Sequence, residues 1–117
     1  MIRATRFVVG SLVVLSVLTF GIVAGADEDI VQMLQSAKTA ADHEAIAAYY
    51  AREAASAKAK VDLHRKMGEI VKRQGGAGVA KWHMDEHCDE LVREFESAAK
   101  QYSALAEAHG SWAKELK

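Results

Sequence analysis

The sequence predicts an all-α protein: a long antiparallel helical hairpin of coiled-coil type, preceded by a short helix and dimerising into a four-helix bundle. Three observations lead to this fold class. The chain contains no proline, which would break a helix. Glycine clusters at one place only, in the stretch GGAG at residues 75–78, and this cluster indicates a turn. On both sides of it, apolar residues recur at alternating steps of three and four, as in packed helices.

The N-terminal segment, residues 1–26, has the layout of a secretory signal peptide. Arg3 and Arg6 precede an uncharged apolar run, and the small residues 24–26 form a cleavage site. An uncleaved anchor is the alternative, because the run 7–26 is just long enough to span a bilayer. Either way we expect residues 27–117 in the periplasm or outside the cell, with membrane contact only if residues 7–26 are retained.

The charge balance of the exported part argues against nucleic acid as a partner. The chain has 15 basic residues, two of them in the signal segment, which leaves 13 against 16 acidic residues and a formal charge of −3. No basic stripe is present that would follow a phosphate backbone. The single cysteine, Cys88, cannot form an internal disulfide, so we expect it to be buried, metal-bound or paired between chains.

Nothing in the chain predicts an enzyme. The haem-attachment pattern C-x-x-C-H and the Glu-x-x-His pairs of di-iron bundles are both absent. A cysteine nucleophile at Cys88 would have no oxyanion-forming loop beside it.

The hairpin divides into elements as follows. The predicted elements are a short N-terminal helix or linker at 27–38 and the hairpin at 39–117, with helices from about Ala40 to Arg73 and from about Val79 to Glu115 around a turn at 74–78. Thr39 and Asp42, three residues apart, have the spacing of an N-terminal cap, in which the hydroxyl accepts a free backbone N–H.

Each predicted helix carries a heptad seam of apolar and small residues. The first seam is His43, Ala47, Tyr50, Ala54, Ala57, Val61, His64, Gly68 and Val71. The second is Met84, Cys88, Leu91, Phe95, Ala98, Tyr102, Leu105, His109, Trp112 and Leu116. A second apolar strip, Leu63, Met67 and Ile70, lies beside the first seam. We interpret it as a homodimer surface or a contact for another protein; alternatively, residues 28–37 fold back over it.

All five histidines and the cysteine fall into a layer near the turn and a layer at the open end. Folding the hairpin about residue 76 places His64 opposite Cys88 and His43 opposite His109. Near the turn, the pairs His83/His87 and Met84/Cys88 have i,i+4 spacing, which brings two side chains within reach of one ion. Imidazole, thiolate and thioether together favour copper or zinc over magnesium or calcium.

The predicted metal ligands are therefore His64, His87 and Cys88, with His83, Met67 and Met84 as alternates and His43 and His109 as a second layer. The alternative is that seam histidines are packed, hydrogen-bonded residues that fix register, as polar seam residues do. For His43 and His109 this structural interpretation is the stronger one.

The function predicted from the sequence is binding of a soft transition metal, copper or zinc, for buffering, delivery or sensing. The layout resembles small periplasmic helical-hairpin proteins that sense or buffer heavy metals, in architecture alone and without a shared motif. The alternative function is a structural or protein-interaction module without metal.

Overall fold

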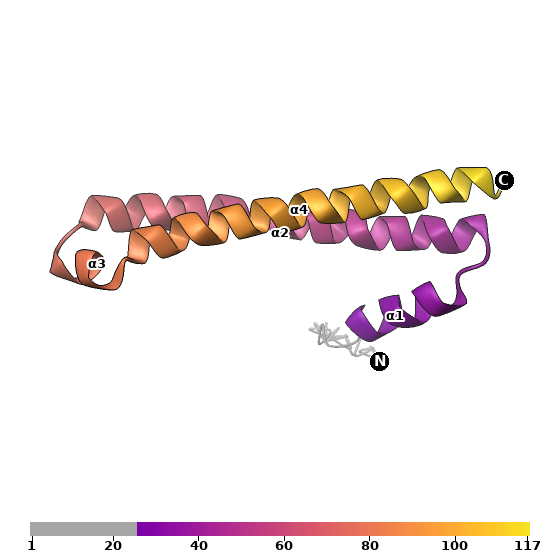
Figure 1. The fold of residues 1–117 in the computed structure, drawn as a ribbon, viewed down its shortest axis with the longest axis horizontal. Helices are drawn as coiled ribbons and strands as arrows, with labels where there is room; N and C mark the ends of the chain where they lie inside the picture. The colour runs from indigo at the N-terminus through magenta and orange to yellow at the C-terminus, as the bar shows by residue number, and fades with distance from the viewer. Residues whose placement is uncertain (1–25) are drawn as a thin grey trace, which may run out of the picture.

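The fold is an extended helical hairpin, seen in a computed structural model that describes residues 26–117 (Figure 1). Helices make up 91% of this part of the chain and strands none, so the predicted all-α hairpin is confirmed. The helices are α1 (Ala26–Ser36), α2 (Ala40–Gln74), α3 (Ala77–Trp82) and α4 (Met84–Glu115). None of these four helices is both long and apolar enough to cross a membrane. The predicted signal segment lies outside the described residues.

The start of α2 is fixed by a capping box, as the sequence predicts. The Thr39 hydroxyl accepts from the Asp42 backbone N–H at 3.2 Å, and the Asp42 carboxylate accepts from the Thr39 N–H at 2.8 Å. The same carboxylate accepts from the Lys38 N–H at 2.9 Å. These backbone donors, Lys38 first, hold the pKa of Asp42 below its usual 3.8. The cap ends the linker after α1 and sets where the long helix begins.

The connection between the two long helices is longer than the predicted turn. After Gln74 the chain turns at Gly75 and Gly76, which have φ of 57° and 92°, a region that favours glycine. It then forms the six-residue helix α3, at a place where the sequence predicted the beginning of the second long helix. His83 separates α3 from α4 with φ 49° and ψ 40°. This left-handed break was not predicted, because nothing marks it in a sequence without glycine at that point.

His83 therefore holds a backbone conformation that costs an ordinary L-residue about 1 kcal/mol relative to glycine. We expect His83→Gly to raise the free energy of unfolding by about 0.5–1 kcal/mol, since glycine adopts this conformation freely. Urea denaturation of both proteins measures the difference. The same substitution at His87, which lies within α4, should destabilise by about 1 kcal/mol instead. A destabilised His83→Gly variant would show that the break is not a source of strain.

The core between α2 and α4 is thin. The side chains that it buries are mostly small: His43, Ile46, Ala54, Ala57 and Val61 on α2, and Cys88, Ala99 and Ala113 on α4. Within α2 and α4, only Ile46 is a large side chain with no exposed surface. Small residues let the two backbones approach closely, but they contribute little burial energy per residue.

The α2 seam is largely as predicted, whereas the α4 seam rotates away from its predicted line. Met84, Leu105, Trp112 and Leu116 are exposed, and Ala99 and Ala113 lie in the contact instead. An α-helix has 3.6 residues per turn, so a strict seven-residue seam drifts by about 20° per heptad unless the helices supercoil fully. Large side chains are thereby left at the edge of the hairpin.

Helix α1 packs on the open end of the hairpin, beside the beginning of α2 (Figure 1). Ile30 is buried, and Met33 and Ser36 lie next to Ala41 and Ala45 of α2. The strip Leu63, Met67 and Ile70 lies further along α2 toward the turn and stays 53%, 42% and 45% exposed. The fold-back of this segment over the strip, one of the predicted alternatives, is not what the structure shows.

Candidate functional site

The most concentrated group of functional side chains is an aromatic and histidine cluster at the open end of the hairpin. His43 and Tyr50 of α2 meet Tyr102, His109 and Trp112 of α4. The ring of His43 stacks on Trp112 at a centroid distance of 4.1 Å. Tyr50 stacks between Tyr102 and His109, at 6.3 and 5.9 Å. Such contacts stabilise beyond their buried area and fix how the rings lie.

At the centre of this cluster, the two histidines face each other as predicted. Nδ1 of His43 lies 3.0 Å from Nδ1 of His109, a hydrogen bond in which one ring donates and the other accepts. The ring centroids are 5.2 Å apart with 23° between their planes, so the rings lie side by side. His43 is only 3% exposed. Burial, together with the charge of His43, holds the pKa of His109 below its usual 6.5.

The predicted pairing of His64 with Cys88 is replaced by a pairing one helical turn away. Cys88 lies against Gly68, where an added Cβ would come within 3.3 Å of the Cys88 Cβ. His64 stacks on Phe95 instead, at 5.5 Å and 13°. The unpredicted α3 and the break at His83 lengthen the connection and shift the register. Nδ1 of His64 is buried without a hydrogen-bond partner.

The close contact at Gly68 gives a testable expectation. Gly68→Leu would insert a side chain where Cys88 already lies, and we expect a loss of about 1–3 kcal/mol of unfolding free energy through overpacking. Urea denaturation measures it. Gly110→Leu is the matched control, because a Cβ there meets nothing within 4 Å. Equal losses at both glycines would show that helix geometry, and not the contact with Cys88, is responsible.

The other predicted ligands do not converge on one point. His83 and His87 are exposed and lie near Glu86 and Glu90, at 3.4 and 4.0 Å. Met67 and Met84 are exposed as well. Across residues 26–117, no group of three or more His, Cys, Asp or Glu side chains is placed to hold a metal ion. The structure thus brings together His43 and His109, but not the layer near the turn.

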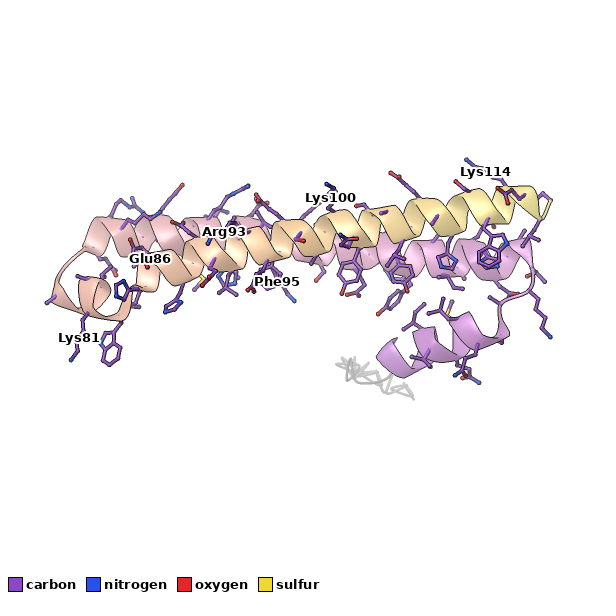
Figure 2. The ribbon with its side chains drawn as sticks, viewed as in Figure 1. Lys81, Glu86, Arg93, Phe95, Lys100 and Lys114 are labelled. Carbon is purple, nitrogen blue, oxygen red and sulfur yellow. The ribbon has the colours of Figure 1, made fainter. Side chains whose placement is uncertain are left out.

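The two open sides of the hairpin differ in chemistry. One side, the charged face, carries the ion pairs between α2 and α4: Arg65–Glu96, Lys72–Asp89 at 2.9 Å and Glu44–Lys117 at 2.6 Å. These residues are spaced by multiples of seven, so each helix contributes one row. Hydrogen bonding to Asp89 raises the pKa of Lys72. Phe95 and Lys100 project from opposite sides of α4 (Figure 2).

The other side, the aromatic face, has a groove lined by Glu53, Ser56, Ala57, Lys60, Phe95, Ala98 and Tyr102. The Lys60 amine lies 5.2 Å from the centre of the Phe95 ring. Residues seven positions apart share a helix row. On α2, the row of Lys60 therefore continues to Met67, and the row of Ser56 continues to Leu63 and Ile70. On α4, the row of Ala98 continues to Leu105 and Trp112.

Trp112 was placed on the α4 seam by the sequence, but not among the site residues. Its position three residues after His109, a spacing that puts both on one face of a helix, is the signal that would have joined it to the histidine pair.

Fold and site together define a class: an all-α helical hairpin with a histidine and aromatic cluster at its open end. No protein family, curated protein or solved structure shows significant similarity to the chain.

Proposed function

We propose that this protein is a non-enzymatic interaction module that pairs with a second copy of itself through the aromatic face, forming a four-helix bundle. One observation carries the proposal. While the ion pairs between α2 and α4 occupy the charged face, five large exposed apolar side chains lie on helix rows of the aromatic face: Leu63, Met67, Ile70, Leu105 and Trp112. A contiguous apolar surface with a polar border is typical of an association site.

The thin core supports a second copy as the occupant. Two helices that fully bury only one large side chain need further apolar burial, and small scaffolds commonly obtain it by oligomerisation. The aromatic face is also self-complementary in charge. Glu53 and Lys60 have opposite charge and lie on one row, on either side of Ser56 and Ala57. In an antiparallel two-fold pairing centred there, each Glu53 lies beside Lys60 of the second copy.

Native mass spectrometry of the exported protein, purified without chelator and without affinity-tag histidines, tests this function. We expect the mass of a homodimer at micromolar concentration. The same spectrum reports whether residues 1–26 have been removed, as expected of an exported protein, and whether metal is bound. A monomer at this concentration would overturn self-association, and a complex with another protein would assign the face to that partner.

A second candidate function is soft-metal binding for buffering, delivery or sensing, as expected from the sequence. It is favoured by the two Nδ1 atoms of His43 and His109, which lie only 3.0 Å apart. Imidazole nitrogen suits copper and zinc. Metal binding in the predicted layer near the turn is supported by Nδ1 of His64, which is buried without a hydrogen-bond partner. Against it, Cys88 lies beside Gly68 and not beside His64.

A further inference from the structure

At the open end of the hairpin, the Nδ1 atoms of His43 and His109 and the ring of Trp112 surround a single point. The imidazoles of His43 and His109 lie side by side, with Nδ1 directed at Nδ1. The Trp112 ring centroid lies 4.1 Å from that of His43 and 6.1 Å from that of His109. With 5.2 Å between the imidazoles, these distances place their midpoint about 4.5 Å from the Trp112 centroid, inside the ~6 Å range of cation–π attraction.

We propose that His43 and His109, capped by Trp112, form a two-coordinate site for a soft monovalent cation, copper(I). This inference rests on the second candidate function, metal binding. The ligand set determines the ion. Two neutral imidazoles suit copper, and the cluster offers no thiolate or third ligand for tetrahedral zinc. A tryptophan face attracts a cation that has lost its water.

Binding requires a change of tautomer and a small opening of the pair. In the neutral pair, one Nδ1 carries a proton and the other has a free lone pair. To coordinate through both Nδ1 atoms, the donor ring moves its proton to Nε2, and the pair releases no net proton. Two bonds of about 2.0 Å in a nearly linear arrangement need about 4 Å between the nitrogens, so the rings separate by about 1 Å.

Charged groups near the pair leave the site open to a monovalent ion. Glu44 is neutralised by Lys117 at 2.6 Å, and the Asp42 carboxylate is engaged with backbone N–H groups of the helix cap. Neither carboxylate is therefore directed at the space between the imidazoles. The site offers nitrogen donors and an aromatic face, a combination that selects a soft ion over magnesium or calcium.

Competition with a chromogenic copper(I) chelator under anaerobic conditions tests the site in the full exported protein. Cys88→Ala provides the background, because a thiol would bind copper(I) by itself. We expect one equivalent of copper(I) per chain. His109→Gln should weaken its binding by roughly 100-fold or more, as expected from loss of one of two ligands, and Trp112→Leu by roughly 5–30-fold through loss of the cation–π contact.

His87→Gln tests the predicted layer near the turn, because His87 is an exposed histidine of the same helix, and copper(I) held at the open end should not respond to it. Circular dichroism checks that each variant keeps its helix content, and His43→Asn provides a second route to removing the pair. Trp82→Phe leaves Trp112 as the only tryptophan, whose fluorescence copper(I) should quench.

Two outcomes would overturn the site. In the first, the wild-type protein binds copper(I), Cys88→Ala alone abolishes this binding, and His109→Gln does not change it. This result would place the metal near the turn and keep the metal-binding function. A protein that competes for no copper(I) at all would remove both the site and that function, whatever its oligomeric state.

Discussion

Replacing Leu63 and Met67 by glutamate is expected to convert the proposed dimer into a monomer. Both side chains are about half exposed in the single chain, so the substitution changes little within the hairpin itself. In the proposed bundle the same positions are covered, and four carboxylates would be buried without partners. Unpaired buried charge costs several kcal/mol, and like charges add repulsion. We expect dimer affinity to fall by roughly 100-fold or more, a loss of about 3 kcal/mol.

Sedimentation equilibrium over a range of concentrations measures this change. Ala55→Glu is the matched control: Ala55 is exposed on the same helix, seven residues before Asp62, which lies 3.8 Å from Arg65 of the charged face. It should leave the association constant unchanged. A wild-type dimer that tolerates both glutamates at Leu63 and Met67 would place the interface elsewhere.

A matched exchange of charges tests the proposed two-fold arrangement. Glu53→Lys should weaken the dimer by placing two lysines together, and adding Lys60→Glu should restore it, because the pair is then reversed in both copies. Without restoration, the bundle would have a different register or a parallel arrangement.

Local patterns predicted the hairpin well where one signal dominated. The Thr39/Asp42 spacing located the start of α2, because a capping box satisfies backbone donors within four residues of chain. The α2 seam followed from its alanines and Val61, whose burial needs only helical periodicity. The meeting of His43 with His109 was also predicted, since long side chains reach across a register error of about one turn.

What could not be predicted depends on contacts between distant residues. The left-handed conformation of His83 has no local marker, since glycine or asparagine would ordinarily occupy such a position. It lengthens the connection, and Gly68 rather than His64 consequently lies against Cys88. The predicted α4 seam followed the large residues, whereas Ala99 and Ala113 are the residues buried in the contact. Small residues in a contact give a weak hydrophobic pattern.

Acid is expected to destabilise the open end of the hairpin through His109. Its pKa in the folded protein is lowered, first by burial and second by the charge of His43. Between that pKa and the unfolded value near 6.5, the unfolded chain binds more protons than the folded one. The stability contributed by a neutral His109 is therefore complete above about pH 6.5 and is lost as the pH falls below it. One proton gives at most about 1.4 kcal/mol per pH unit, reduced here by solvent screening because the ring is partly exposed.

The geometry gives this loss a structural cause. A neutral or singly protonated pair keeps the hydrogen bond between the two Nδ1 atoms, whereas a doubly protonated pair sets two N–H groups and two charges against each other at 3.0 Å. The facing groups do not offset this repulsion. Glu44 is paired with Lys117, Asp42 is engaged at the helix cap, and Tyr50 and Trp112 are uncharged.

Thermal melts at fixed protein concentration between pH 7.5 and 4.5 measure the effect. The melting temperature of the wild type should fall across this range, and His109→Gln should flatten the fall because glutamine does not titrate. His87→Gln, on the exposed side of α4, should retain the wild-type dependence. The capping carboxylate of Asp42 acts in a lower window, since its pKa lies below 3.8 and its contribution is lost only as the pH falls through that value. An equally steep fall in His109→Gln would assign the acid sensitivity to groups outside the pair.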